Sequence, residues 1–202
     1  MRHRRAVERL RMLAEACQEL RHRSPEEPLL HEAWVFGDVL DGADPIESVR
    51  LALAIDLPPD DVPWCSNPPE SVWLVDTLRL NKGGFTYWWR SRHEPVWNHL
   101  IREPVRFWSL DGPDEAVLDA LRERRLTDLP RASGTPDELR RRTAVELDRS
   151  LDRLREIRER YRDRDWRQEH RRAGRHPEDH LWDAVDGYVD LVDQLRRPHA
   201  QE

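Results

Sequence analysis

The chain has few cysteines and no long apolar run. Its two cysteines, Cys17 and Cys65, are far apart in the sequence, so they form neither a disulfide framework nor a cysteine zinc motif. No segment approaches the roughly 20 apolar residues that cross a bilayer. The basic start MRHRR leads into an amphipathic helix rather than the apolar core of a secretory signal. These absences predict a cytoplasmic protein that makes no membrane contact.

Lysine is nearly absent as well. Lys82 is the only lysine among 34 basic residues, and the others are arginines, as is typical of a GC-rich genome. The 40 acidic residues give a formal net charge of −6 at pH 7. Because a negatively charged protein is repelled by phosphate backbones, this charge predicts no extended contact with nucleic acid.

The composition is that of a folded protein with a large solvated surface. Nine tryptophans argue against disorder, because large aromatic side chains dominate burial in protein cores. Hydrophobic residues make up 38% of the chain and charged residues 37%, a balance that favours amphipathic helices around a compact centre. The 202 residues suffice for one core domain with a helical appendage.

The first 130 residues alternate between helical and extended patterns. Apolar residues recur at steps of three and four from Ala6 to Leu20, which predicts an amphipathic helix. In the stretch from Val49 to Leu57 the odd positions are apolar, and small residues such as Ala52 and Ala54 occupy even positions. This pattern predicts a strand with one buried face and one closely packed face. The other predicted elements are strands over 29–40 and 104–110 and helices over 71–80 and 115–124.

The last third of the sequence is helical in pattern. Thr135, Pro136 and Glu138 form a capping box with proline at the first helical position, which predicts a helix to about residue 165. A second helix is predicted over 177–195. We therefore predict an α+β fold, with a small mixed β-sheet flanked by helices and a C-terminal antiparallel helical hairpin. The predicted domains are an α+β core over 1–130 and a hairpin over 135–196 that packs on it.

The order of these elements, with the stretch FGDVLDGADPIESVRLALAIDLP, resembles the core of polymerase-β-type nucleotidyltransferases. In that superfamily a Gly-Ser after the first strand contacts the triphosphate. An Asp-x-Asp on the second strand and a third carboxylate hold Mg²⁺. By this resemblance Gly37 matches the glycine, and Asp38 stands in the place of the serine. Asp56 matches the second aspartate, and Asp111 is the candidate third carboxylate.

Two functional hypotheses follow from this resemblance. An active enzyme would hold Mg²⁺ with Asp38, Asp56 and Asp111, since metal ions about 3.5–4 Å apart need converging carboxylates. However, Ala54 stands where the first aspartate of the motif is expected, and alanine cannot bind a metal. This departure favours a diverged, non-catalytic protein that binds a nucleotide or a protein partner and needs no cofactor. Alternatively, the acids belong to a turn and a strand end and serve structure alone.

Cationic side chains alternate with aromatic ones in the segment FTYWWRSRHEPVWNHLIREPVRFW. Arg90, Arg92 and His99 lie in this segment, whose composition suits the binding of a nucleotide base or phosphate. Lys82, in the turn before it, and Gly37 complete the predicted ligand-binding set. The alternative is that the tryptophans form core beneath the arginine stems.

Other chemical motifs are weak or missing. His176 and His180 have a helical spacing, but the Glu of H-E-x-x-H and a third ligand are lacking, so we predict no bound metal. No serine or cysteine nucleophile signature is found. The last helix carries aspartates at steps of three and four, which we expect to pair with arginines of the preceding helix. These are Asp179, Asp183, Asp186, Asp190 and Asp193.

The whole chain more closely resembles a group of uncharacterised proteins from high-GC Gram-positive bacteria. The match lies in LALAIDLPPDDVPW, WWRSRHEPVWNHLI and LWDAVDGYVDLVD, and it implies an architecture but no activity. The sequence therefore assigns no function. The leading hypothesis is a non-catalytic binding protein, and the alternatives are an active Mg²⁺-dependent nucleotidyltransferase and a helical-hairpin interaction module. The sequence predicts no oligomeric state.

Overall fold

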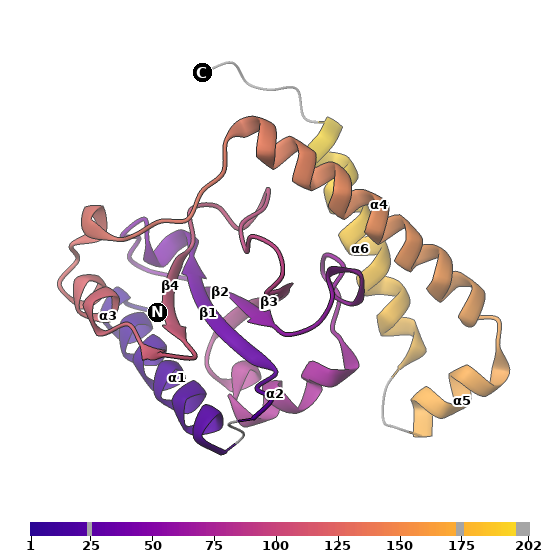
Figure 1. Cartoon of the computed structure of the whole chain (residues 1–202), viewed down its shortest axis with the longest axis horizontal. Helices are drawn as coiled ribbons and strands as arrows, with labels where there is room; N and C mark the ends of the chain where they lie inside the picture. Colours follow the sequence, from indigo (N-terminus) through magenta and orange to yellow (C-terminus); the bar gives the residue numbers. More distant parts are fainter. Residues whose placement is uncertain (24–25, 173–175, 197–202) are drawn as a thin grey trace. The chain divides into compact units, whose positions relative to one another are not determined.

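The chain divides into two compact units (Figure 1). The computed structural model describes residues 1–23, 26–172 and 176–196. The sheet unit consists of Met1–Pro59 and Pro68–Ser133, and the helical unit consists of Asp60–Asn67 and Gly134–Glu202. The chain passes from one unit to the other near residue 133, and the segment 60–67 is grouped with the helices of the second unit.

The sheet unit contains a five-stranded mixed sheet with helices, so the predicted α+β class is confirmed. The strand order is β3-β2-β1-β4-β5, with β2 and β3 parallel and the other neighbours antiparallel. The strands are β1 (Leu30–Phe36), β2 (Val49–Ile55), β3 (Phe85–Ser91), β4 (Val105–Ser109) and β5 (Gly112–Pro113). The helices are α1 (His3–Arg23), α2 (Val72–Thr77) and α3 (Glu115–Arg122).

Strand β2 is buried on both faces. Leu51 and Leu53 are fully buried on one face, and Ala52 is fully buried on the other. Burial of a leucine side chain such as Leu51 or Leu53 stabilises the fold by about 1.5–3 kcal/mol. Across the sheet, Ala52 lies in register between Trp34 of β1 and Trp88 of β3. The small residue predicted on this face therefore leaves room for two large indoles on the neighbouring strands.

Strand β3 and the end of β1 differ from the sequence prediction. No strand was expected at Phe85–Ser91, although its aromatic residues favour extended structure. Its partner is the parallel strand β2, reached through the long connection that contains α2, and such distant pairing leaves no local signal. Strand β1 ends at Phe36 rather than at residue 40. Gly37 has φ +71°, a conformation that favours glycine and starts a short 3-10 turn.

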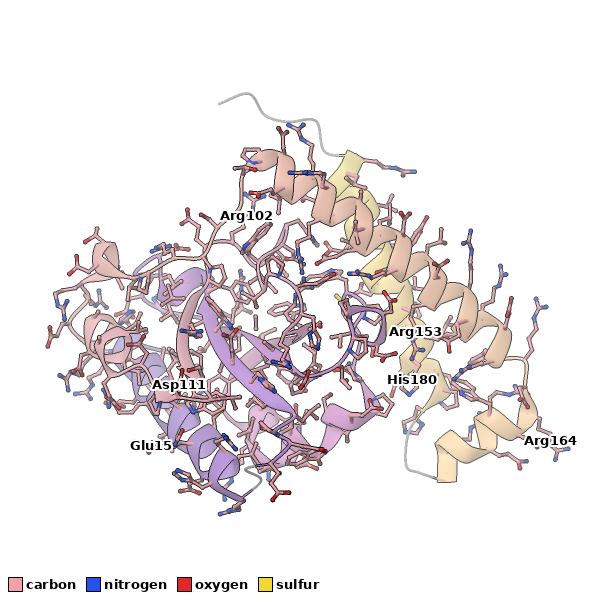
Figure 2. All side chains as sticks on the ribbon, viewed as in Figure 1. Glu15, Arg102, Asp111, Arg153, Arg164 and His180 are labelled. Atoms are coloured by element: carbon pink, nitrogen blue, oxygen red, sulfur yellow. The ribbon has the colours of Figure 1, made fainter. Side chains whose placement is uncertain are left out.

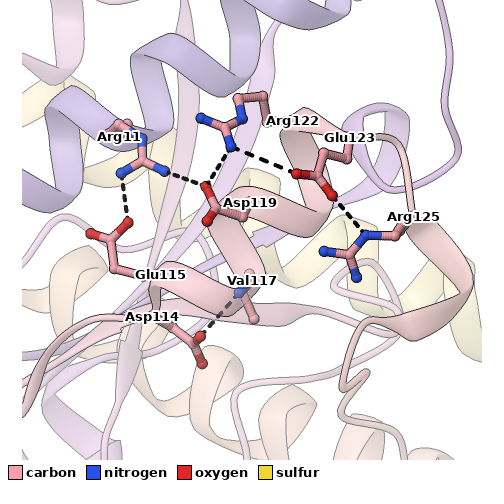
Figure 3. A network of polar contacts seen from close by, with 8 residues as sticks. All are labelled: Arg11, Asp114, Glu115, Val117, Asp119, Arg122, Glu123 and Arg125. Carbon is pink, nitrogen blue, oxygen red and sulfur yellow. Dashed lines mark hydrogen bonds and ion pairs between the residues drawn. The ribbon is translucent and has the colours of Figure 1, made fainter.

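Helices α1 and α3 pack beside each other and against strand β4 (Figure 1). Gln18 of α1 accepts a hydrogen bond from the Trp108 indole at 3.2 Å. Arg11 joins the two helices, with Nη1 2.6 Å from Glu115 and Nη2 3.1 Å from Asp119 (Figure 3). At the start of α3, the Asp114 carboxylate accepts the backbone N–H of Val117 at 3.0 Å and so caps the helix.

The helical unit contains α4 (Pro136–Arg160), α5 (Arg164–Arg172) and α6 (Pro177–Arg196). Helices α4 and α6 lie against each other. Tyr161, just after α4, donates a hydrogen bond to Glu178 in the first turn of α6, so the two helices run antiparallel. The predicted capping box at Thr135 is present. Along the chain, the further helix α5 lies between α4 and α6, where the sequence pattern predicted no separate helix.

The loop 60–67 is held on α6 by side-chain and backbone contacts. The Trp64 indole donates to Asp190 at 2.7 Å, and Asn67 donates to Asp183 at 2.9 Å. Burial raises the pKa of Asp183, and the Asn67 hydrogen bond opposes this. At Gly187 the helix approaches the loop so closely that an added Cβ would lie 2.3 Å from the Trp64 carbonyl oxygen. The absence of a side chain at this position therefore permits the loop to dock.

Replacing Gly187 tests this close approach through the sign of its effect. In an ordinary helix interior, Gly→Ala stabilises by about 1 kcal/mol. We expect Gly187→Ala to lower the free energy of unfolding by about 1–3 kcal/mol instead, because Cβ collides with backbone. Chemical denaturation followed by circular dichroism measures this change in the free energy of unfolding. Val189→Ala, on the exposed side of α6, is the control and should change stability by less than about 0.5 kcal/mol. A more stable Gly187→Ala variant would contradict the packing.

The cap of α3 gives a second stability prediction. Asp114→Ala removes the acceptor of the Val117 N–H and should cost about 1 kcal/mol of unfolding free energy. Asp111→Ala, at an exposed position three residues earlier, is the matched control and should have little effect. Equal losses in the two variants, measured by denaturant titration, would show that the cap contributes nothing specific.

Candidate functional site

Asp38 and Asp56 lie at opposite ends of the β1–β2 pair. Phe36, just before Asp38, is in register with Arg50, whereas Ile55, just before Asp56, is in register with Leu30. At about 3.4 Å per residue, the strand between these two ends spans roughly 17 Å. A two-metal centre needs carboxylates around ions about 3.5–4 Å apart. The active-enzyme hypothesis requires Asp38 and Asp56 to converge, but the antiparallel pairing of β1 and β2 places them at opposite ends.

Asp111 does not complete a metal centre either. It lies exposed in the turn between β4 and β5 (Figure 2), and β1 separates β4 from β2. Two strand spacings of about 4.8 Å place β4 roughly 10 Å from β2. Among the described residues, no group of three His, Cys, Asp or Glu side chains could hold a metal ion. The arrangement required of an active nucleotidyltransferase is thus not formed by these residues.

The predicted ligand-binding residues are divided between the two ends of the sheet. Gly37 and Lys82 lie near the amino ends of β2 and β3, and the Arg50 side chain lies 3.4 Å from the Cβ position of Gly37. Arg90 and His99 are buried. Arg92 lies beyond the carboxyl end of β3, where its side chain is 41% exposed. The structure therefore does not gather the five residues into one site.

Arg92 is instead part of a polar group that we name the strand-end cluster: His31, Asp56, Arg92 and His93. Asp56 Oδ1 accepts hydrogen bonds from Arg92 Nε at 2.6 Å and from His93 Nε2 at 2.9 Å. Asp56 Oδ2 lies 3.4 Å from His31 Nε2. One carboxylate therefore contacts three cationic or potentially cationic side chains.

Backbone pairing brings this cluster together. Asp56 directly follows β2, and its N–H donates to the Leu29 carbonyl at 2.8 Å. The Arg92 N–H donates to the Ile55 carbonyl at 3.0 Å, which continues the parallel β2–β3 ladder. The cluster thus lies at the carboxyl ends of two adjacent parallel strands. In open sheets with parallel strands, ligands bind preferentially outside these ends.

The electrostatics fix the charge of two members. Burial acts to raise the pKa of Asp56. The Arg92 guanidinium, helped by His31 and His93, outweighs burial and holds the pKa of this carboxyl below its ordinary value. Burial lowers the pKa of His31, and the Arg92 charge lowers it further against the attraction of Asp56. At neutral pH the cluster therefore contains an ionised Asp56 and a neutral His31.

The contacts of Asp56 leave two outward groups available. Asp56 binds Arg92 through Nε, and neither Nη1 nor Nη2 donates a hydrogen bond within the described part of the chain. Asp56 binds His93 through Nε2, so the second ring nitrogen, Nδ1, is not used in this contact. The His93 side chain is 46% exposed. A carboxylate that holds a guanidinium and an imidazole in this way fixes the orientation of both side chains.

Two members of the cluster, His31 and His93, were missed from the sequence. Each becomes adjacent to Asp56 only through strand pairing: His31 by the antiparallel β1 and His93 by the parallel β3. The run Arg92-His93 directly follows the aromatic segment that forms β3. Recognising that segment as a strand would have placed both residues at a strand end, as candidate site residues. The predicted alternative that tryptophans form core is confirmed for Trp108, which is buried.

Comparison with known proteins gives a family and no activity. Residues 1–197 match the family described as Domain of unknown function (DUF7711). The chain belongs to this family. No curated protein and no solved structure matches the chain. Among the described residues of this DUF7711 chain, no helix combines the length and the apolar character that crossing a bilayer requires.

The depressed pKa of His31 predicts a pH-dependent stability. A histidine with a lowered pKa in the folded state stabilises fully above its unfolded value of about 6.5, and this contribution is lost as the pH falls below that value. We expect the thermal midpoint to fall between about pH 7.5 and pH 5.5, and His31→Gln to reduce this fall. His22→Gln, at an exposed position of α1, is the control and should keep the wild-type slope. The same slope in His31→Gln and wild type would contradict the assignment.

Proposed function

We propose that the chain is a non-catalytic binding protein that holds the oxyanion of a small ligand, phosphate or carboxylate, at the strand-end cluster. The observation that carries this proposal is the hydrogen bond of 2.6 Å from Arg92 Nε to Asp56. It orients the guanidinium without using its two Nη groups. Nucleotides belong to the ligand class that this site would accept, and we propose a cytoplasmic, bacterial setting for it.

The geometry of Arg92 suits an oxyanion for a specific reason. A guanidinium fixed through one edge presents its remaining N–H groups as a fork that matches two oxygens of a phosphate or carboxylate. Lysine has no such fork and binds as a point charge. His93 donates through Nε2 to Asp56, so its Nδ1 can donate to an oxyanion oxygen only in the protonated ring, whereas in the neutral ring it accepts from a donor group of the ligand.

The charge of Asp56 does not preclude an anionic ligand. Arg92 offsets it, so the cluster is close to neutral when both imidazoles are neutral, and each protonated imidazole adds one positive charge. The cluster is thus not a strong attractor at long range. Its selectivity would come from short, directed hydrogen bonds, which are worth about 1.5–3 kcal/mol each when one partner is charged. The near-neutral cluster therefore favours binding of one oxyanion by directed hydrogen bonds over unspecific attraction of any anion.

Calorimetric titration of the full chain tests the proposal, with ATP in metal-free buffer as ligand, inorganic phosphate as competitor and adenosine as the uncharged comparison. We expect ATP to bind, phosphate to compete and adenosine to give no heat. Arg92→Gln should weaken ATP binding about tenfold or more, because a charged bidentate contact is lost. Arg92→Lys should retain only part of the affinity, since lysine keeps the charge and loses the fork.

Arg106→Gln is the matched control. Arg106 also belongs to the sheet unit, forms an ion pair of 2.7 Å with Glu32, and has a 46% exposed side chain. Its loss removes the same charge without touching the strand-end cluster, so ATP affinity should stay within about twofold of wild type. The proposal is wrong if ATP gives no heat, or if Arg92→Gln and Arg106→Gln weaken binding equally.

A further inference from the structure

The aspartates of α6 are divided into two sets by what they contact. Asp183 and Asp190 accept hydrogen bonds from Asn67 and Trp64 of the docked loop. Asp179, Asp186 and Asp193 are exposed. At steps of seven residues, these three lie along one side of the helix. The acidic stripe thus has an inner set that holds the loop and an outer set that faces solvent.

The outer aspartates do not pair with α4, contrary to the sequence prediction. Several arginines of α4 form ion pairs within their own helix, such as Arg153 with Glu156 at 2.7 Å and Arg155 with Asp152 at 3.1 Å. Arg149 pairs with Asp60 of the loop at 2.9 Å. Over residues 1–23, 26–172 and 176–196, no ion pair involves the three outer aspartates. Acidic residues three or four positions from an arginine on the same helix can pair with it. These arginines therefore need no partner on α6.

The same side of α6 carries exposed apolar side chains. Trp182 is 71% exposed, and Val189, seven residues later, is also exposed. A helix turns through nearly two full turns in seven residues, so these side chains lie in one line beside the outer aspartates. Tryptophan is among the residues that contribute most to binding when a partner covers it. We name this surface the α6 outer face: Asp179, Trp182, Asp186, Val189 and Asp193.

We propose that the α6 outer face binds a basic amphipathic segment of a partner protein. Apolar side chains of that segment would cover Trp182 and Val189, and its lysines or arginines would meet the three aspartates. The negative charge of the three aspartates favours a basic segment over the other surfaces that could cover this face. Two α6 outer faces placed against each other would juxtapose six carboxylates, and like charges across an interface disfavour such a contact. An anionic membrane surface is disfavoured for the same reason.

The experiment measures fluorescence anisotropy of a labelled helical peptide with a leucine face and a lysine face, titrated with the full chain. The peptide in which glutamate replaces lysine tests charge, and a scrambled leucine–lysine peptide tests the amphipathic pattern. We expect micromolar binding of the first peptide alone, weakened by salt of about 0.5 M. Trp182→Ala should weaken it about tenfold or more. The triple change of Asp179, Asp186 and Asp193 to Asn should weaken it and reduce its salt dependence.

Trp73→Ala provides the matched control, because Trp73 is an exposed tryptophan on α2 of the sheet unit. It should bind the peptide like wild type. The proposal is overturned by equal binding of the glutamate or scrambled peptide, by no binding, or by equal losses in Trp73→Ala and Trp182→Ala. It is also overturned if sedimentation shows that wild type is a dimer and Trp182→Ala a monomer, since a second copy is then the occupant.

Discussion

The sheet unit depends on the double pairing of strand β2. This strand is buried on both faces, bonded to the antiparallel β1 on one edge and to the parallel β3 on the other. Apolar residues on one face and alanines on the other make both contacts possible. Since β1 runs opposite to β2 while β3 runs with it, β2 decides which side chains meet at each end. Asp56, Arg92, His93 and His31 meet at its carboxyl end, and Gly37 and Lys82 lie at its amino end.

Elements with strong local signals could be predicted from the sequence. The capping box at Thr135 and the turn before α3 mark helix starts through backbone N–H groups that need acceptors. The periodicity of α1 and the alternation in β2 reflect burial of one face. By contrast, β3 was missed because its stabilising partner is distant in sequence. The docking of the loop 60–67 on α6 has no local signal either, because it depends on Gly187, more than a hundred residues away.

The candidate site could be predicted only in part, for the same reason. Asp56 and Arg92 were each singled out by residue type and position, but they were placed in different roles. The resemblance to nucleotidyltransferases rested on the order of elements along the chain. Whether Asp38 and Asp56 converge depends on strand direction and register, which the order does not contain. Once the pairing is known, the same aspartate becomes the anchor of a guanidinium and an imidazole instead of a metal ligand.

We propose that ligands bind at the carboxyl ends of β2 and β3. The most direct measurement is a titration of the isotope-labelled full chain with inorganic phosphate, followed by backbone amide chemical shifts in NMR. We expect the largest changes at residues 56–57 and 91–94, beside the strand-end cluster. Changes confined to residues 37–38 and 82–84 would place the ligand at the opposite end, and no saturable change would mean that the cluster only joins the strands.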